Sequence, residues 1–222
     1  MIKTKCKAVL FDLDGTLVNT LTDLGNAINA PLVQKGYEAL SDERVQSLVG
    51  NGLVNALHNA LNAYHIDTNG ADFDESFRIL MDFYRAHPVD QSRPYEGICD
   101  LLTNLNAPYG ILSNKADALV QKIVATLFPD FPFVSVFGLR QEFPRKPDPY
   151  GIIEFAEKLN IQPQEVLYVG DSEVDVKTAH AAGAPCIVCS WGFRGRAALE
   201  ALGCPIVDNA QELFTSIEQI IR

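Results

Sequence analysis

Short apolar runs alternate with helical patterns along this chain, and this alternation constrains the fold more than any other feature. The runs occupy residues 7–11, 109–112, 133–137, 166–169 and 186–189. Helical patterns follow at residues 98–105, 117–127, 151–159, 174–182 and 197–202. Such alternation is typical of a parallel sheet that helices cover on both faces. We therefore predict an α/β protein with a doubly wound, Rossmann-like parallel sheet.

Residues 17–93 break the alternation, because they contain no convincing strand and show only helical periodicity. Three apolar stripes recur there at helical spacing: Leu24, Ile28 and Leu32; Leu53, Leu57 and Leu61; and Phe73, Phe77, Leu80 and Tyr84. We expect these side chains to pack in the core of an all-helical insertion. The predicted organisation is an α/β core of residues 1–16 and 94–222, with a helical domain of residues 17–93.

Composition excludes several classes of protein. The 222 residues carry 18 Lys plus Arg against 28 Asp plus Glu, and this net charge of −10 disfavours non-specific binding to nucleic acid. No apolar run approaches the ~18 residues that span a bilayer. The apolar stretch after the basic N-terminus is also too short for a signal peptide. We expect a cytoplasmic protein with no nucleic-acid or membrane partner, as a monomer or a homodimer.

The five cysteines are scattered, and only Cys186 and Cys189 are closely spaced. In a strand, a spacing of three residues places two side chains on opposite faces. We interpret both cysteines as small buried side chains, not as a metal or redox pair.

Acidic side chains follow two of the predicted strands. The first strand leads into Asp12 and Asp14, which alternation places on the same side of an extended segment. Another strand leads into Asp171, with Asp175 one helical turn further. Carboxylates that converge at the edge of a sheet suit Mg²⁺. The alternatives are an ordinary turn at the first pair and a helix-capping role for Asp175, because Ser172-x-x-Asp175 is also a capping-box pattern.

Two further segments present polar groups. Ser113 and nearby backbone N–H groups could hold a phosphate oxygen at the start of the following helix, although the segment taken alone favours an ordinary helix cap. Lys146 precedes Pro147 and Pro149, whose fixed φ angles stiffen the backbone. A lysine held in this way suits an anion, and the alternative is an exposed side chain in a surface turn. Together, in this order, the four segments form a specific combination.

The combination resembles the haloacid dehalogenase superfamily of phosphohydrolases. The matching stretches are residues 11–17 (FDLDGTL), 112–114 (LSN), 146–149 (KPDP) and 170–175 (GDSEVD). The helical insertion is similar to the cap of the subgroup that contains the phosphoglycolate phosphatases. One departure is Asn19, which stands where the family usually has Asp.

The resemblance implies a Mg²⁺-dependent phosphatase that forms an aspartyl-phosphate. It makes Asp12 the nucleophile and Asp14 the general acid and base. It implies that Ser113, Asn114 and Lys146 contact the phosphorylated substrate. The implied metal ligands are Asp12, Asp14 through its backbone carbonyl, Asp171 and Asp175.

The segment Gly50-Asn51-Gly52 resembles the substrate loop of phosphoglycolate phosphatases, although its glycines could equally serve a helix–helix turn. We expect a small phosphorylated metabolite as substrate, with 2-phosphoglycolate as the first candidate. The alternatives are a sugar-phosphate phosphatase or β-phosphoglucomutase-like enzyme, an inorganic pyrophosphatase, and a catalytically idle phosphate-binding module. Phosphonate hydrolases are disfavoured, because they lack an acid at the position of Asp14 and use a cap lysine, whereas the insertion holds only Lys35.

Overall fold

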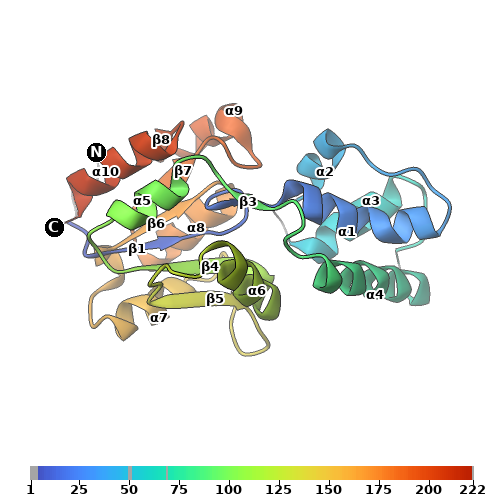
Figure 1. The fold of residues 1–222 in the computed structure, drawn as a ribbon, viewed down its shortest axis with the longest axis horizontal. Helices are drawn as coiled ribbons and strands as arrows, with labels where there is room; N and C mark the ends of the chain where they lie inside the picture. The colour runs from blue at the N-terminus through green and yellow to red at the C-terminus, as the bar shows by residue number, and fades with distance from the viewer. Residues whose placement is uncertain (1–4, 50–51, 69, 222) are drawn as a thin grey trace. The chain divides into compact units, whose positions relative to one another are not determined.

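The computed structural model describes residues 5–49, 52–68 and 70–221, which form two compact units (Figure 1). Unit 1 comprises Met1–Asn19 and Pro94–Arg222, and unit 2 comprises Thr20–Arg93. The first boundary lies after Asn19, whereas the sequence placed it after residue 16. Leu17 and Val18 remain in unit 1 because both are fully buried and donate backbone hydrogen bonds to the Leu13 carbonyl.

Unit 1 is built on a six-stranded sheet with the order β5-β4-β1-β6-β7-β8. Its strands are β1 (Ala8–Phe11), β4 (Tyr109–Ala116), β5 (Ser135–Leu139), β6 (Val166–Gly170), β7 (Cys186–Cys189) and β8 (Ile206–Val207). Each neighbouring pair is parallel, so all the carboxyl ends lie at one edge of the sheet. The predicted parallel sheet is confirmed. The short strand β8 was not predicted.

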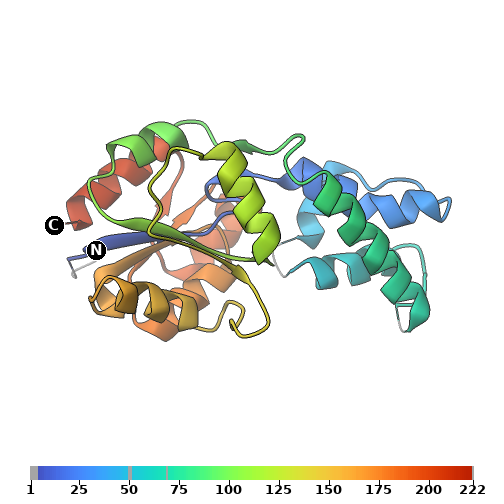
Figure 2. The same cartoon turned by 60° about the horizontal axis from the view of Figure 1, so that its bottom comes forward.

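Helices cover both faces of this sheet. They are α5 (Ile98–Asn104), α6 (Asp117–Leu127), α7 (Tyr150–Lys158), α8 (Glu173–Ala182), α9 (Gly195–Leu199) and α10 (Ala210–Ile220), with short 3₁₀ turns at Pro163–Glu165 and Glu200–Leu202. Figure 2 shows α5, α6 and α10 on one side of the sheet and α7 and α8 on the other. The doubly wound prediction is therefore confirmed, and α10 is an addition to it.

The position of the central strands in the core explains why their sequences are continuous apolar runs. Every residue of β1 and β6 is buried, because these strands lie in the middle of the sheet with helices on both faces. On the side of α7 and α8, Leu10 and Tyr168 from the sheet belong to the same hydrophobic cluster as Phe155 from α7.

Unit 2 is helical, as predicted. Its helices are α1 (Leu21–Gln34), α2 (Asp42–Leu48), α3 (Leu53–Asn62) and α4 (Ala71–Ala86). Most of the predicted stripe residues are buried, while Leu53, Phe73 and Phe77 are half-buried. The segments β2 (Val18–Asn19) and β3 (Arg93–Pro94), where the chain passes between the units, form a two-stranded sheet.

Asp23, on α1, fastens the returning chain of unit 2. Its buried carboxylate accepts hydrogen bonds from the backbone N–H groups of Gln91 and Ser92 and from the Ser92 hydroxyl, at 2.6–3.1 Å. Cys186 and Cys189 are both buried in β7, in agreement with the strand interpretation. Among the described residues, no helix combines the length and the hydropathy needed to cross a membrane.

Candidate active site

The carboxyl edge of the unit 1 sheet brings together polar side chains from distant parts of the chain. Asp12 follows β1 directly, Asp171 follows β6, and Ser113 lies on β4 two residues beyond its last pairing with β1. β1 lies between β4 and β6, so these three strands present their ends to one region. Lys146 comes from the loop between β5 and α7 and also reaches this region.

Lys146 is buried between two carboxylates. Its Nζ atom lies 2.8 Å from Oδ1 of Asp12 and 2.8 Å from Oδ1 of Asp175. Burial alone would lower the pKa of this lysine, but Asp12 and Asp175 outweigh burial and hold the pKa well above its usual range. Lys146 is therefore a permanent positive charge in the site.

Asn114 holds the main chain of Lys146. Its Oδ1 atom accepts a hydrogen bond of 2.7 Å from the Lys146 N–H, and its Nδ2 atom donates one of 3.0 Å to the Lys146 carbonyl. In the structure the side chain of Asn114 contacts the backbone of Lys146, and its expected contact with substrate stays a prediction. These two hydrogen bonds fix the backbone of Lys146 relative to β4.

One oxygen of the Asp12 carboxylate makes both of the polar contacts seen for this side chain among the described residues. Within the described residues, its Oδ1 atom meets the Leu13 N–H at 2.7 Å and the Lys146 ammonium at 2.8 Å. Burial raises the pKa of Asp12 to about 7; Lys146 opposes this rise, and the Asp175 and Asp14 carboxylates add to it. Oδ2 is the oxygen left for an electrophile or a cation.

Asp175 is saturated with protein donors. Oδ1 accepts from Lys146 Nζ and from the Tyr168 hydroxyl, and Oδ2 accepts from the N–H groups of Asp171 and Ser172 and from the Ser172 hydroxyl. The capping box weighed from the sequence is present. Asp175 thereby positions Lys146 and the start of α8, and the contacts support this role more than direct metal ligation.

The Asp171 carboxylate has far fewer hydrogen-bond donors than that of Asp175. Within the described part of the chain, its carboxylate accepts one hydrogen bond, of 2.6 Å, from the Phe193 N–H to Oδ2. Burial raises the pKa of Asp171 well above its usual range, and the nearby Asp175 and Asp12 carboxylates raise it further. Among the described residues, no lysine or arginine forms a salt bridge with this carboxylate, and Lys146 only partly offsets the rise in pKa.

The carboxylates of Asp12, Asp171 and Asp175 each offer an oxygen within 4.8 Å of the others, so the group could hold a metal ion. Crowded, buried carboxylates repel one another and favour a cation between them. Oxygen donors of this kind fit a hard divalent cation. Asp12 and Asp171 are the two members with an oxygen to spare, and they are the ligands that the geometry favours.

Three glycines make room for the aspartates. A Cβ atom at Gly15 or Gly192 would stand 2.2 or 2.3 Å from Oδ2 of Asp171, and one at Gly170 would stand 2.3 Å from Cγ of Asp175. Gly15 also has a φ of +84°, which favours glycine independently. Sequence reasoning missed Gly192, because nothing local marks a residue that approaches Asp171 from the end of β7.

Asp14 pairs with a lysine that sequence reasoning also missed. The Lys115 Nζ atom lies 2.6 Å from Oδ1 of Asp14, and the Ser113 hydroxyl lies 3.5 Å from Oδ2. The expected strand ended at residue 112, but β4 continues to Ala116. Extending the strand would have placed Ser113 and Lys115 on one face by alternation.

The segment after β7 closes one side of the site. The indole Nε1 of Trp191 donates a hydrogen bond of 3.1 Å to the Thr16 carbonyl. Arg194 donates two hydrogen bonds, of 3.0 and 3.2 Å, to the Glu173 carboxylate at the start of α8. Both contacts hold the segment that delivers the Phe193 N–H to Asp171.

The predicted substrate loop belongs to unit 2. Gly50 and Asn51 lie outside the described residues. Gly52 precedes α3 with a φ of +87°, which agrees with the turn interpretation of this glycine.

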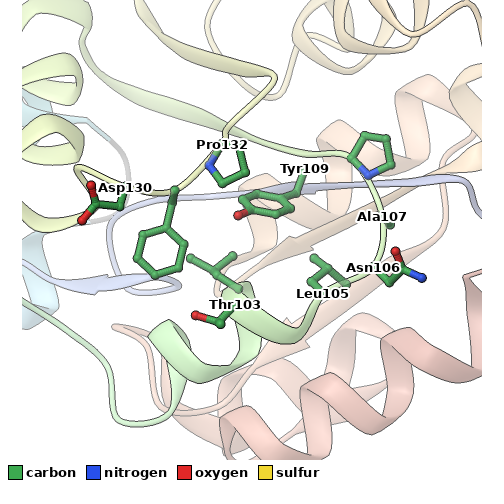
Figure 3. A pocket seen from close by; sticks show the side chains of 10 residues that line it. Thr103, Leu105, Asn106, Ala107, Tyr109, Asp130 and Pro132 are labelled. Atoms are coloured by element: carbon green, nitrogen blue, oxygen red, sulfur yellow. The ribbon is translucent and has the colours of Figure 1, made fainter.

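A pocket of about 630 Å³ lies elsewhere in unit 1 (Figure 3). Tyr109, the first residue of β4, lines it together with Leu102 and Phe131. The pocket therefore lies at the amino end of β4, whereas the carboxylates follow the carboxyl ends of the strands. It is separate from the site described above.

Comparison with known proteins agrees with this geometry. Residues 9–189 match the family described as "Haloacid dehalogenase-like hydrolase". The chain belongs to this family. The phosphoglycolate phosphatase of Chromobacterium violaceum is 35% identical to this hydrolase over 199 residues, which cover 88% of this chain and 90% of that protein. The phosphoglycolate phosphatase of Photorhabdus laumondii is 31% identical over 216 residues, or 95% and 92% of the two chains.

Solved structures share the fold of this hydrolase. A protein from Lactobacillus delbrueckii subsp. bulgaricus gives a TM-score of 0.88 at 30% identity, over 96% of this chain and 99% of that chain. A haloacid dehalogenase-like family protein from Streptococcus pneumoniae gives 0.84 at 22% identity, over 95% and 98%. The recognition drawn from the four segments is confirmed.

Proposed function

We propose that this hydrolase is a Mg²⁺-dependent phosphatase that cleaves 2-phosphoglycolate in the cytoplasm through an aspartyl-phosphate. The observation that carries the reaction class is the environment of Asp12, a buried carboxylate that directly follows β1 and contacts the Lys146 ammonium through Oδ1. The choice of substrate rests on the relatives named phosphoglycolate phosphatase, at 35% and 31% identity.

The proposed reaction has two steps. In the first, an oxygen of Asp12 attacks phosphorus, the bond from phosphorus to the leaving oxygen breaks, and Asp14 gives its proton to that oxygen. In the second, water attacks the phosphorus of the aspartyl-phosphate, the bond from phosphorus to the Asp12 oxygen breaks, and the water gives a proton to Asp14. The products are an alcohol, inorganic phosphate and the original Asp12 carboxylate, so the ester and one water are consumed.

The neighbours of Asp12 have distinct parts in this proposal. Lys146 supplies a fixed positive charge next to the transferring group, and the Ser113 hydroxyl offers a hydrogen bond to one of its oxygens. Asp175 holds the side-chain ammonium of Lys146, and Asn114 holds its backbone N–H. Mg²⁺ held by Asp12 and Asp171 would neutralise charge on the phosphoryl group and lower the repulsion between the carboxylates.

The test is release of inorganic phosphate from a panel of compounds, with and without Mg²⁺. The panel contains 2-phosphoglycolate, sugar phosphates and pyrophosphate, and the control is Asp12→Asn. We expect Mg²⁺-dependent turnover with the highest kcat/KM on 2-phosphoglycolate and none in the variant. A preference for a sugar phosphate or pyrophosphate would overturn the substrate, and absence of release from every compound would overturn the phosphatase itself.

A further inference from the structure

Lys115 is the second buried lysine of the site, and the two-step reaction leaves it without a role. Its side chain is 5% exposed, and its Nζ atom lies 2.6 Å from Oδ1 of Asp14, whose side chain is 18% exposed. A buried ammonium group is stable only when it is paired. The pair also joins the ends of two adjacent strands, because Asp14 follows β1 and Lys115 lies on β4.

The contact engages one particular oxygen of Asp14. A carboxyl group that donates a proton carries it on one oxygen, while its other oxygen can only accept hydrogen bonds. Lys115 has no acceptor and donates to Oδ1, so a proton on Asp14 resides on Oδ2. This is the oxygen 3.5 Å from the hydroxyl of Ser113, the residue that the proposed function assigns to a phosphoryl oxygen.

The backbone of Lys115 belongs to the same arrangement. Its N–H donates a hydrogen bond of 3.1 Å to the Ser113 hydroxyl oxygen. Lys115 therefore fixes Ser113 through its main chain and Asp14 through its side chain, on one face of β4. A displacement of either group would change the distance between the proton donor and the reacting phosphoryl group.

We propose that Lys115 is a positioning residue for proton transfer: it orients the Asp14 carboxyl so that Oδ2 delivers the proton to the leaving oxygen and later receives one from water. This inference rests on the proposed phosphatase function. Two other roles for Lys115 are distinguishable from it, namely direct binding of the substrate phosphoryl group and a purely structural ion pair.

The test uses two esters that differ in their need for a proton. The alkoxide released from 2-phosphoglycolate needs protonation, whereas p-nitrophenolate is a stable anion that departs without it. Single-turnover formation of the aspartyl-phosphate and steady-state kcat and KM are measured for both esters. The variants are Lys115→Met, which removes the donor at similar length, Lys115→Arg, which keeps a charged donor, and the control Lys158→Met, from an exposed lysine on α7.

We expect Lys115→Met to slow phosphorylation by 2-phosphoglycolate on the order of 10²-fold, the effect of a misplaced reacting group. Phosphorylation by p-nitrophenyl phosphate should stay near the wild-type rate and appear as a burst, followed by slow turnover because hydrolysis still uses Asp14. Lys115→Arg should recover part of the loss on 2-phosphoglycolate. Lys115→Arg also provides the test if Lys115→Met does not fold. Its guanidinium group stands at a different place from the lysine ammonium, so phosphorylation by 2-phosphoglycolate should still slow, by less than in Lys115→Met, while phosphorylation by p-nitrophenyl phosphate should not.

Other outcomes overturn the inference. Equal losses on both esters would indicate a structural ion pair, and a raised KM with unchanged kcat would indicate a substrate contact. Variants that behave like Lys158→Met would leave Lys115 without a part in the reaction. Failure of the wild-type protein to turn over either ester would instead overturn the proposed function, and the inference with it.

Discussion

Asp171 lies against the main chain of Gly192 with no room for a methyl group between them. A Cβ atom at position 192 would stand 2.3 Å from both Cβ and Oδ2 of Asp171, and 2.6 Å from the Gly15 carbonyl. The Asp171 carboxylate is thus held between two glycine-containing segments, one after β1 and one after β7. This position follows from tertiary packing alone.

Gly192→Ala should displace Asp171 and weaken Mg²⁺ binding together with phosphatase activity. Overpacking of this kind costs about 1–3 kcal/mol in the free energy of unfolding. Urea unfolding and a Mg²⁺ titration check both effects. Gly25→Ala is the matched control, because a Cβ there meets Val45 at an ordinary 3.4 Å, and Ala favours the helix α1. Unchanged Mg²⁺ affinity in Gly192→Ala would contradict the packing argument.

Asp175→Asn should destabilise the protein strongly, although the side chains have the same shape. The change leaves Lys146 with Asp12 as its one remaining carboxylate and turns an acceptor of five hydrogen bonds into a group that also donates. Breaking a buried ion pair costs about 3–5 kcal/mol. Chemical denaturation measures the loss. Glu200→Gln, which removes the exposed 3.6 Å pair with Arg196, should show no measurable loss.

The stability of the metal-free protein should depend on pH through Asp12. Its pKa is raised to about 7 by burial, whereas the unfolded value is near 4, so between these values the folded state binds the proton more tightly. The unfolding free energy therefore falls as pH rises through this window. Asp12→Asn loses the contact with Lys146 at every pH, but it should lack the pH-dependent fall. Its unfolding free energy should therefore rise relative to that of wild type between pH 4 and 7, by a few kcal/mol across the window.

Mg²⁺ should oppose the fall in unfolding free energy with rising pH, because a cation binds ionised carboxylates. Added Mg²⁺ should stabilise wild type more at pH 8 than at pH 5, and Asp12→Asn should lose most of that difference. Urea unfolding with EDTA or with Mg²⁺ at the two pH values provides the measurement. A wild-type protein that gains as much from Mg²⁺ at pH 5 as at pH 8 would disprove the link to the carboxylates.

Trp191 should report metal binding without any substrate. It is the single tryptophan of the chain, its indole donates to the Thr16 carbonyl, and it lies two residues before Phe193, whose N–H holds Asp171. We expect a saturable change in intrinsic fluorescence on Mg²⁺ addition. Asp171→Asn should abolish the change, whereas Glu142→Gln, at an exposed position, should retain it. Identical titrations of wild type and Asp171→Asn would place the metal elsewhere.

Sequence reasoning predicted the elements whose signals are local. Continuous apolar runs mark β1 and β6 because these strands are buried on both faces, and helical periodicity marks α1 and α3. It missed the short strand β8 and the helix α10 that follows it. The strand β4 was predicted too short, because Ser113, Asn114 and Lys115 are polar residues in an otherwise apolar strand.

The order of residues along the chain also indicates which acidic residues follow the strands, and hence that Asp12, Asp14 and Asp171 gather at one edge of the sheet. The partners of these residues depend on how distant segments pack together. Lys115 pairs with Asp14 across 101 residues, and the Phe193 N–H reaches Asp171 across 22. Hydrogen bonds and ion pairs act over about 3 Å, so the fold must first bring distant segments together. Local sequence patterns therefore indicate the reactive side chains, whereas the contacts of each side chain depend on the packing of segments that are distant in the sequence.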